Sequence, residues 1–354
     1  MTLYIGVDFH PHQQTVCWGD LETGETNSQT LPHDVDKVRE FYQSMPPAIV
    51  GIEATSKAMW FEQILAETNH KLVVGNPALI RKKATSRHKS DKRDAELILN
   101  LLIKNEFPAL WRRSVENNQV LEMLKARLNL VHQRTKVYNR LQALAHNFGL
   151  PKGKMKTNYF QALVKGAKTD EVGEFQRHQL FNQLEFVNQQ IEELEVWLHQ
   201  KAEIDEQVKL LLTQKGVGYL TGLCLVNTIG EISRFTKPTK QVPAFIGIEP
   251  LGHESAGKSK TKGISRAGSS LARFLLGQSA NIVARYDAKF KAFYKRLAKR
   301  KPKPVAKTAT ARKVLVKLVI MMRDKITADE FDQRGRTVND ARGAQGLRLS
   351  GLPD

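Results

Sequence analysis

The first hundred residues alternate between short apolar runs and longer amphipathic stretches. Strands are predicted at Leu3–Asp8, Gln14–Gly19, Ala48–Glu53 and Lys71–Gly75. Helices are predicted at Asp36–Met45 and Ala54–Glu67, and Leu21–Thr26 carries the glycine of a hairpin turn. Strands interleaved with helices of this length indicate an α/β layer built on a mixed sheet.

From about Trp111 the apolar positions recur every three or four residues, the period of a long helix. The first such segment runs to Phe148, has a polar break near Arg134-Thr135, and is ended by Gly149 and Pro151. The second is more regular and places the following residues on one seam of a coiled coil: Leu180, Leu184, Val187, Ile191, Leu194 and Leu198. Joined near Pro151–Lys156, the two helices form either a simple antiparallel hairpin or an arm for dimerisation.

These patterns divide the chain into four parts. We expect an α/β domain over residues 1–111, a coiled-coil helical arm over 112–206 and a mainly helical domain over 207–328. Residues 329–354 are rich in Gly, Arg, Asp and Asn and are expected to form a flexible tail. A length of 354 residues allows this number of domains.

The net charge of the chain indicates what kind of partner it binds. The chain has 55 Lys and Arg against 36 Asp and Glu, a formal net charge of +19, which favours a polyanion such as nucleic acid. Two cysteines exclude a disulfide framework and a four-thiolate zinc site. The N-terminus lacks the pattern of a signal peptide and no apolar run reaches the roughly 20 residues of a membrane helix. We therefore expect a cytoplasmic protein without a membrane partner.

Four carboxylates stand where a metal site is expected. Asp8 and Glu53 end two predicted strands, and strand ends are where sites form in open α/β sheets. Asp91 and Asp94 are three residues apart at the start of a helix, which places both on one helix face. Chemistry at a phosphodiester uses oxygen ligands for one or two Mg²⁺ ions, roughly 4 Å apart when two are bound. Mn²⁺ has similar ligand preferences.

Basic residues surround the second acidic pair and also fill a later stretch. The first group is Arg81, Lys82, Lys83, Arg87, Lys89, Lys92 and Arg93. The second lies in Lys289–Lys313, which has eleven Lys or Arg and no acid, and includes Lys295, Arg296, Lys299, Arg300 and Lys301. Both are predicted to contact phosphates, although a solvated helix face remains the alternative for a charge run.

Less specific interpretations of the carboxylates stay open at this point. Each acid alone fits a helix cap or a surface charge. An Asp that ends a strand also occurs in actin-like and sugar kinases, but these follow it with a Gly/Thr-rich phosphate turn, whereas Phe9–His12 follows here. His10 and His12 are interpreted as turn-exposed and are left out of the site.

The C-terminal half contains two further motifs. Lys215–Gly218 separates two apolar helical runs and resembles the hairpin of a helix–hairpin–helix module, with a simple turn as the alternative. Ser255 lies in a Gly-rich basic loop, and a serine in such a loop can attack a phosphodiester if its alkoxide is stabilised. The neighbouring cations are Lys258, Lys260, Lys262 and Arg266. Taken alone, Ser255 is an ordinary loop serine.

Several of these motifs together resemble one family. The segments YIGVDFH, GIEATS and NPALIRKKATSRHKSDKRDA, followed by AFIGIEP, are similar to the transposases of the IS110 family of bacterial insertion sequences (IS110/IS1111 type) and to the related Piv DNA invertases. The resemblance extends from Leu3 to about Ala328. It implies an RNase H-like, RuvC-like N-terminal domain whose D-E-D-D tetrad is Asp8, Glu53, Asp91 and Asp94.

The resemblance also implies the chemistry. Ser255 matches the serine nucleophile, while Ser259 stays a second candidate and Ser265 a third, because the segment to Gly268 is about one residue shorter than expected. The family's activity is Mg²⁺-assisted strand transfer through a 5′-phosphoserine, guided by a structured non-coding bridge RNA that pairs with target and donor DNA. A dimer or tetramer, located with the bacterial nucleoid, is implied as well.

Two other functions remain as alternatives. A RuvC-type junction resolvase would use the carboxylates without a covalent step, and a basic nucleic-acid scaffold would use neither carboxylates nor serine. The sequence does not give the target, donor or guide sequences, and it does not separate a transposase from an invertase.

Overall fold

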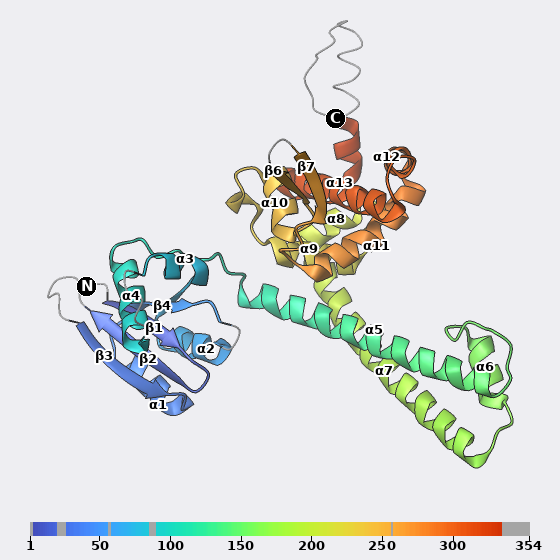
Figure 1. The fold of residues 1–354 in the computed structure, drawn as a ribbon, viewed down its shortest axis with the longest axis horizontal. Helices are drawn as coiled ribbons and strands as arrows, with labels where there is room; N and C mark the ends of the chain where they lie inside the picture. The colour runs from blue at the N-terminus through green and yellow to red at the C-terminus, as the bar shows by residue number, and fades with distance from the viewer. Residues whose placement is uncertain (1–2, 20–25, 56–57, 85–89, 256–257, 335–354) are drawn as a thin grey trace, which may run out of the picture. The chain divides into compact units, whose positions relative to one another are not determined.

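The structure is a computed structural model that describes residues 3–19, 26–55, 58–84, 90–255 and 258–334. The chain divides into two compact units, Met1–Arg112 and Arg113–Asp354, which are described separately (Figure 1). None of the helices in the described ranges combines the length and apolar character needed to span a bilayer.

The first unit is built on a five-stranded mixed sheet of order β3-β2-β1-β4-β5. The strands are β1 (Leu3–Phe9), β2 (Gln13–Gly19), β3 (Thr26–Pro32), β4 (Ala48–Glu53) and β5 (Lys71–Gly75). The first three are antiparallel neighbours, while β4 pairs parallel to both β1 and β5. This confirms the predicted α/β layer with a mixed sheet.

Helices cover both faces of this sheet. Helices α1 (Val35–Gln43) and α2 (Met59–Glu67) pack on one face, where Tyr42 and Phe61 are fully buried with Ile5 and Val7 of β1. Helix α4 (Asp91–Ile103) packs on the other face, where Ala95 and Leu99 meet Cys17. The central strand β1 is therefore buried from both sides, which fixes the position of the residues at its end.

Three details of the first unit differ from the prediction. The edge strand β3 has the exposed polar sequence TNSQTLP, so its apolar pattern does not reveal a strand. Helix α2 begins at Met59, five residues later than predicted, and a short helix α3 (Pro77–Lys82) follows Asn76, whose side chain caps it. Most of the predicted turn at Leu21–Thr26 lies outside the described residues.

Two long helices begin the second unit. Helices α5 (Val115–Asn147) and α7 (Glu171–Ile204) pack along each other, and α6 (Asn158–Gly166) lies in their connection (Figure 1). Helix α5 continues through the polar break at Arg134, whose guanidinium donates to Asn188 Oδ1 of α7 at 3.2 Å. Four of the predicted seam positions are buried, namely Leu184, Val187, Ile191 and Leu198. The connection between the two helices is longer than the short joint predicted near Pro151–Lys156, because it includes α6. Phe160 and Val164 of α6 pack against both long helices.

The remainder of the second unit is a helical domain with one hairpin. Its helices are α8 (Glu206–Leu212), α9 (Tyr219–Ile229), η1 (Ile232–Arg234), α10 (Pro238–Ile246), α11 (Ser270–Tyr286), α12 (Ala288–Ala298) and α13 (Lys303–Asp324). They enclose one core to which Leu276, Val314 and Leu318 contribute fully buried side chains. Strands β6 (Pro250–Ser255) and β7 (Lys258–Ile264) form an antiparallel pair.

The hairpin and the chain end correct two expectations. The basic segment around Ser255 is a pair of strands and not a loop, because its alternating residues pair from Pro250↔Ile264 to Ser255↔Lys258. Near the C-terminus, residues 328–334 are helical, and Asp332 accepts a hydrogen bond from Lys317 of α13 at 2.9 Å. The packed part of the chain therefore extends into the expected tail, of which residues 335–354 lie outside the described residues.

Candidate functional site: a carboxylate–histidine cluster at the end of strand β1

The site begins with the alternation of side chains along β1. Gly6, Asp8 and His10 are two residues apart and therefore face the same side of the sheet, the side covered by α4. A β-carbon on Gly6 would lie 2.2 Å from the carbonyl oxygen of Ala95 in α4. The absence of a side chain at Gly6 lets α4 lie directly on the strand, so the start of α4 comes close to Asp8.

The start of α4 is fixed by its own sequence. Ser90 is the N-cap, and its hydroxyl accepts from the backbone N–H of Arg93 at 3.3 Å. Asp91 and Asp94 then occupy the first turn, where the helix dipole favours negative charge. A capped helix terminus therefore presents two carboxylates toward the end of β1.

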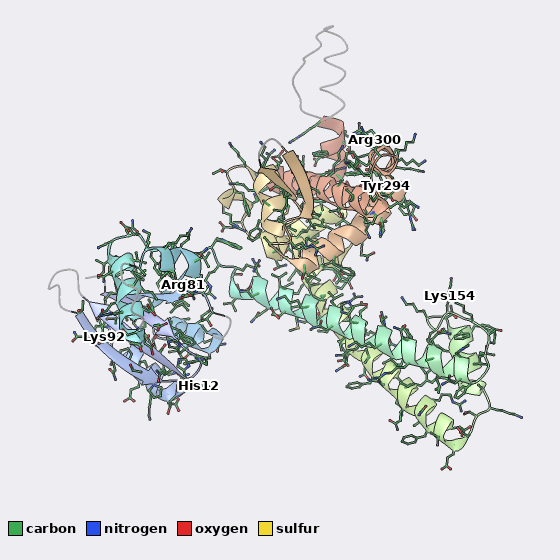
Figure 2. The ribbon with its side chains drawn as sticks, viewed as in Figure 1. His12, Arg81, Lys92, Lys154, Tyr294 and Arg300 are labelled. Atoms are coloured by element: carbon green, nitrogen blue, oxygen red, sulfur yellow. The ribbon has the colours of Figure 1, made fainter. Side chains whose placement is uncertain are left out.

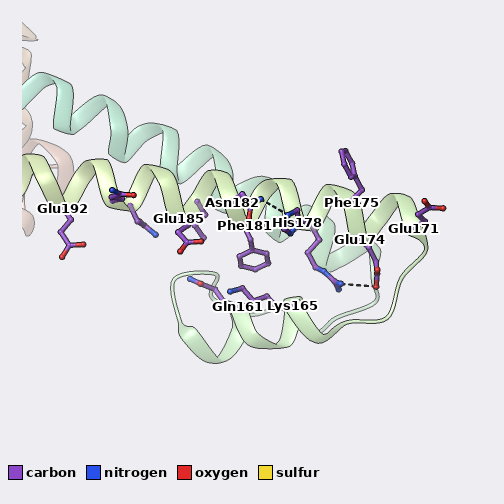
Figure 3. A pocket seen from close by; sticks show the side chains of 14 residues that line it. Gln161, Lys165, Glu171, Glu174, Phe175, His178, Phe181, Asn182, Glu185 and Glu192 are labelled. Carbon is purple, nitrogen blue, oxygen red and sulfur yellow. Dashed lines mark hydrogen bonds and ion pairs between the residues drawn. The ribbon is translucent and has the colours of Figure 1, made fainter.

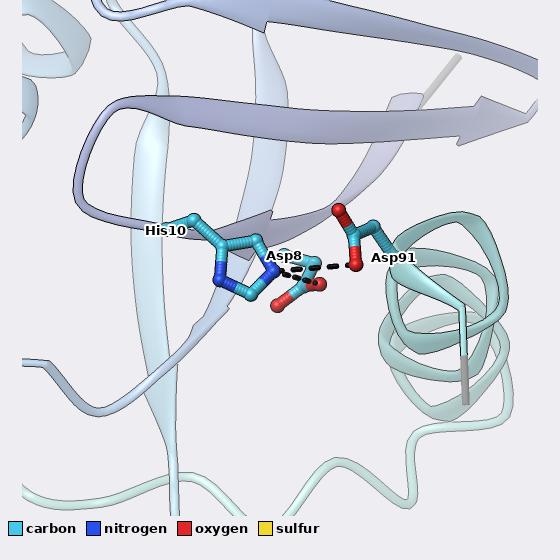
Figure 4. A group of neighbouring side chains, drawn as sticks. All are labelled: Asp8, His10 and Asp91. Carbon is cyan, nitrogen blue, oxygen red and sulfur yellow. Dashed lines mark hydrogen bonds and ion pairs between the residues drawn. The ribbon is translucent and has the colours of Figure 1, made fainter.

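His10 connects the two elements. Its Nε2 lies 3.0 Å from Asp8 Oδ2 and 3.4 Å from Asp91 Oδ1 (Figure 4). The Asp8 side chain is 15% exposed, whereas His10 and Asp91 are 45% and 48% exposed. One ligand atom from each of the three residues lies within 4.8 Å of the others. The cluster is therefore half open to solvent, with Asp8 as its buried member.

Burial and like charge both act on Asp8. Desolvation is the largest cause that raises the pKa of this carboxyl above its ordinary value, and the charges of Asp94 and Asp91 raise it further. The contact with His10 acts in the opposite direction. Burial and the neighbouring carboxylates thus disfavour the ionised form of Asp8, a condition that a bound cation would relieve.

Glu53 ends β4 beside β1, because Val7 pairs with Ile52 in the parallel register. Its carboxylate accepts from the Arg81 guanidinium at 3.3 Å, and it is not a member of the cluster of ligand atoms around Asp8. Of the four predicted carboxylates, the structure brings Asp8 and Asp91 into one cluster, places Asp94 near enough to act on Asp8 through its charge, and leaves Glu53 paired with Arg81.

The donor set suits a divalent metal ion. Two carboxylates and an imidazole supply oxygen and nitrogen ligands that Mg²⁺, Mn²⁺ and related ions accept in proteins. The contact with Arg81 uses one oxygen of Glu53, Oε1, so the other carboxylate oxygen is not engaged by this ion pair. His10 falls outside the predicted site because a histidine followed by a proline is typical of an exposed turn; its position two residues after Asp8 is the one indication in the sequence.

The structure places the predicted serine at a strand end. Ser255 is the last residue of β6, with its backbone opposite Lys258. The second candidate, Ser259, lies in β7 opposite Glu254. Ser265 follows β7, and its hydroxyl oxygen is buried with no hydrogen-bond partner among the described residues. The side chains of Ser255 and Ser259 lie outside the described part of the structure.

Three of the five described basic residues near the carboxylates form ion pairs. Arg81 contacts Glu53, Lys83 contacts Glu106 at 2.7 Å, and Lys92 lies 3.9 Å from Glu96. Lys82 and Arg93 are exposed, and Arg87 and Lys89 lie outside the described residues. Residues 1–112 have 13 Lys or Arg against 14 Asp or Glu, a net charge of −1. The first unit is thus not the source of the chain's positive charge.

The excess positive charge belongs to the second unit. Residues 113–354 have 42 Lys or Arg against 22 Asp or Glu, a net charge of +20. Arg266 follows β7, Lys295 and Arg296 lie on α12, and Lys299, Arg300 and Lys301 are exposed at its end. Figure 2 labels Arg300. Lys258, Lys260 and Lys262 are in β7, where only the backbone is described.

Comparison with known proteins identifies the family to which this chain is similar. A family model for DEDD transposases of IS110 elements, described as "Transposase", matches residues 5–148, which include all four predicted carboxylates. A second model, described as "Transposase IS116/IS110/IS902 family", matches residues 208–295, which include Ser255. The mixed α/β first unit and the mostly helical remainder fit a RuvC-like DEDD enzyme with an additional helical domain.

Curated relatives agree with both matches. The chain is 26% identical over 320 residues to a probable family 20 transposase of Pseudomonas aeruginosa, covering 87% of this chain and 89% of the relative. It is 28% identical over 204 residues, 56% of each chain, to the transposase for insertion sequence element IS1111A of Coxiella burnetii. It is 27% identical over 327 residues to the pilin gene-inverting protein of Moraxella lacunata, covering 88% and 93%.

The chain is therefore a DNA-binding enzyme of the transposase and recombinase class. It belongs to the IS110 family of transposases.

Proposed function

We propose that this transposase breaks and rejoins DNA strands with two groups, the carboxylates at the end of β1 and a serine in the β6–β7 hairpin. The observation that carries the proposal is the convergence of Asp8, His10 and Asp91 within 4.8 Å at a capped helix terminus. A divalent ion held there supplies Lewis-acid stabilisation of charge on phosphoryl oxygens. Mg²⁺ is the proposed ion, with Asp94 and Glu53 as further ligands.

Ser255 is the proposed nucleophile. Its hydroxyl oxygen attacks the phosphorus, the bond from phosphorus to the 3′ oxygen breaks, and the proton lost by the serine is balanced by the one gained at the 3′ hydroxyl. The product is a 5′-phosphoserine, which keeps a phosphodiester linkage for the rejoining step. A new 3′ hydroxyl then attacks the phosphoserine and releases Ser255 in its original form. The position of Ser255 at the end of β6, in a strongly basic unit, supports this role.

The test is a covalent-adduct assay on labelled DNA that carries the ends of the insertion element, with chain purified at mild salt so that bound RNA is retained. We expect the unmodified chain to give a DNA-linked protein band with Mg²⁺ and none with EDTA. Ser255→Ala should remove the band and strand transfer together, whereas the matched variants Ser259→Ala and Ser265→Ala should keep both. A band that disappears in Ser259→Ala instead would move the nucleophile to that position.

The same assay separates recombination from junction resolution. Asp8→Asn should abolish cleavage under either function, because both use the carboxylates. If Ser255→Ala still cuts a four-way junction at the rate of the unmodified chain, the enzyme acts as a resolvase without a covalent intermediate. Steeply salt-dependent DNA binding without any Mg²⁺-dependent cleavage would leave only the scaffold function.

We further propose that a structured bridge RNA guides this enzyme to its target and donor DNA. Support comes from the net charge of +20 on residues 113–354, which suits simultaneous binding of RNA and DNA backbones. Purification at mild salt followed by sequencing of the bound RNA tests this. A discrete RNA with loops complementary to an element end and an insertion site is expected, and random cellular RNA alone would contradict guidance.

The α5–α7 arm is proposed to join copies of the chain into a dimer or tetramer. Two phenylalanines on α7, Phe175 and Phe186, are 66% and 61% exposed although they are large and apolar. They are eleven residues apart, three helical turns, and so face nearly the same direction. Nearby, a groove of about 1010 Å³ lies between α6 and α7, where Lys165 Nζ is 4.8 Å from the Phe181 ring centroid (Figure 3).

Light scattering on the full chain tests the arm. Phe175→Ser with Phe186→Ser should lower the oligomeric fraction at micromolar concentration, because roughly 130 Å² of exposed apolar surface per side chain loses its partner. The exposed polar pair Gln179→Ser and Gln183→Ser is the matched control and should leave the mass unchanged. Equal masses for both double variants would contradict an arm-mediated oligomer.

A further inference from the structure

A groove between three helices of the second unit is lined by positively charged side chains. It has a volume of about 490 Å³ and lies among α11, α12 and α13. One face of α11 and one face of α12 line it. Asn281 and Arg285 are four residues apart on α11, and Tyr294 and Lys295 follow Lys291 by three and four residues on α12. Lys307 of α13 completes the lining.

The four cations of this groove have no acidic partner. Arg285, Lys291, Lys295 and Lys307 form no ion pair with any acidic residue in the described part of the chain. The sequence from Ala256 to Arg323 contains a single acid, Asp287, and its carboxylate caps α12 by accepting from the backbone of Lys289 and Phe290. Nearby Lys289 differs, because it lies 3.5 Å from Asp332. The four positive charges in the groove therefore repel one another, and a bound anion would reduce this repulsion.

The floor of the groove is made of small residues. Ala280 and Ala284 of α11 line it, and Gly277 lies about one turn before Ala280. Lys307 extends over Gly277, since its Cε would be 3.5 Å from a β-carbon at that position. The small side chains keep the space open beneath the cations, while the half-buried ring of Tyr294 and the exposed amide of Asn281 add groups that can contact a nucleobase.

We propose that this groove binds an unpaired segment of nucleic acid, with phosphates on Arg285, Lys291, Lys295 and Lys307 and one base against Tyr294. The inference rests on the proposed function, since it assigns a place to the strands on which the enzyme acts. The labelled Tyr294 and Arg300 in Figure 2 show that the groove and the basic end of α12 belong to one helical region. Phosphates that leave the groove along α12 would meet Lys299 and Arg300 next.

Size and geometry favour an unpaired strand over a duplex. A volume of about 490 Å³ lies in the range that encloses a small organic ligand, comparable to one nucleotide. In a duplex the bases are stacked and paired inside, so none can reach Tyr294 without being flipped out. An unpaired strand presents both its phosphates and the faces of its bases, and base–aromatic stacking tolerates any sequence.

Binding is measured by fluorescence anisotropy on the full chain in EDTA, with fluorescein-labelled U15 RNA, T15 DNA and a 15-base-pair DNA duplex. The groove variant is Lys291→Gln, Lys295→Gln and Lys307→Gln. It should bind both unpaired probes at least about tenfold more weakly and reduce the slope of log affinity against log salt by about 2, three contacts at about 0.7 each. Equal loss on U15 and T15 indicates a site that reads phosphate and base, and loss confined to one assigns the groove to RNA or to DNA.

The control removes the same number of charges elsewhere in the second unit. Lys168, Lys237 and Lys240 are exposed, and changing all three to Gln should weaken binding by less than about threefold. Tyr294→Ala should weaken binding of unpaired probes about tenfold and of the duplex much less, whereas Tyr294→Phe should retain affinity. Thermal melting of each variant verifies that the fold is intact.

Two results would overturn the proposal. One is equal affinity of the groove variant and the charge-matched control for the unpaired probes. The other is an equal loss on duplex and unpaired probes, together with no effect of Tyr294→Ala, which would describe a general basic surface. The assay needs neither metal nor catalysis, so failure of the Ser255 adduct assay with these binding results intact would reject the proposed chemistry and leave the groove in place.

Discussion

Asp8 is the residue at which stability and chemistry oppose each other in this chain. Its side chain is 15% exposed, and it lies near two more carboxylates at the start of α4. Burial and those charges disfavour its ionised form, which is the form that the proposed metal binding requires. A fold selected only for stability would place a neutral side chain here.

Asp8→Asn should therefore stabilise the metal-free chain while it removes metal binding. We expect the free energy of unfolding in EDTA to rise by about 1 kcal/mol, a gain typical of substitutions that relieve a functional site. Added Mg²⁺ or Mn²⁺ at 100 times Kd should stabilise the unmodified chain by about 2.7 kcal/mol and the variant by almost nothing. Urea titrations measure both, with the exposed Glu40→Gln as control. A variant that is less stable in EDTA would contradict this account.

Asp332 illustrates the opposite case, a charge that the fold stabilises. Burial acts to raise its pKa, but the hydrogen bond from Lys317 and the charges of Lys317 and Lys289 outweigh burial and hold the pKa below its usual value. The Lys317 side chain is 5% exposed, so its ammonium group depends on the Asp332 carboxylate for a compensating charge. A group with a lowered folded pKa contributes stability that is present above its unfolded pKa and lost as pH falls through the folded value.

Asp332→Asn should accordingly cost about 2 kcal/mol at pH 7, because it leaves the buried Lys317 ammonium unpaired. The difference between variant and unmodified chain should shrink below about pH 4, where the carboxyl of the unmodified chain takes up a proton. Urea titrations at pH 7, 4 and 3 measure it. The exposed neighbour Asp329→Asn should change stability by less than about 0.5 kcal/mol. A pH-independent difference would show that the ion pair is not the source.

At the scale of elements, the site depends on how closely one helix approaches one strand. Gly6 of β1 lies under α4, and a β-carbon there would come within 2.5 Å of the Leu99 backbone nitrogen as well as the Ala95 carbonyl oxygen. The atoms in the way are backbone, so they cannot turn aside as a flexible side chain would. The distance between Asp8 and Asp91 therefore depends on Gly6, a residue without a functional side chain that lies two positions before Asp8.

Gly6→Ala should displace α4 and weaken both the fold and the site. We expect a loss of about 3 kcal/mol in the free energy of unfolding, at the upper end of the cost of overpacking a core. The stabilisation by Mg²⁺ should fall as well, because the Asp91 carboxylate moves away from Asp8. Gly166→Ala in α6 is the control, since nothing lies within 4 Å of its added carbon. Unchanged metal stabilisation in Gly6→Ala would show that the helix does not set the cluster.

The elements that the sequence predicts well are those with a strong apolar period or a clear cap. The strands β1, β4 and β5 are continuous apolar runs because they are buried, and α7 repeats its seam over five turns. The polar strand β3 is not predicted because it is an exposed edge strand without an apolar pattern. The β6–β7 hairpin is not predicted because it is rich in basic residues and glycines.

The site shows the same division. Asp8, Asp91 and Asp94 follow from strand ends and helix starts, which are local features. The pairing of Glu53 with Arg81 and the position of His10 between two carboxylates depend on contacts between separate elements, which no local pattern contains. The groove of Lys307 and Tyr294 likewise requires three helices to be packed before its charges come together.

At the scale of the whole molecule, charge and chemistry are divided between the two compact units. Residues 1–112 are nearly neutral and hold the carboxylate cluster, while residues 113–354 carry a net charge of +20 and hold Ser255. The affinity for nucleic acid is therefore expected to come from the second unit, and the response to metal from the first. Each unit also has its own core and one buried free cysteine, Cys17 in the first and Cys224 in the second.

These two cysteines allow the units to be followed separately in the unmodified chain. Burial raises the pKa of Cys17 and raises that of Cys224 to about 12, so neither thiol should react with a maleimide until its unit opens. Cys17 packs against Ala95 and Leu99 of α4, the helix that carries Asp91 and Asp94. Mg²⁺ should therefore slow labelling of Cys17 in mild urea about a hundredfold at 100 times Kd, if labelling follows the open population.

Labelling of Cys224 should not change, because its core contains no residue of the proposed metal site. Mass spectrometry of peptides after timed labelling gives both rates from one sample, and Asp8→Asn should remove the protection of Cys17. Equal protection of both thiols would mean that the units unfold as one cooperative body, so that binding at the carboxylates stabilises the serine-bearing unit as well. Protection of Cys17 alone would establish that metal binding and nucleic-acid binding act on units that open independently.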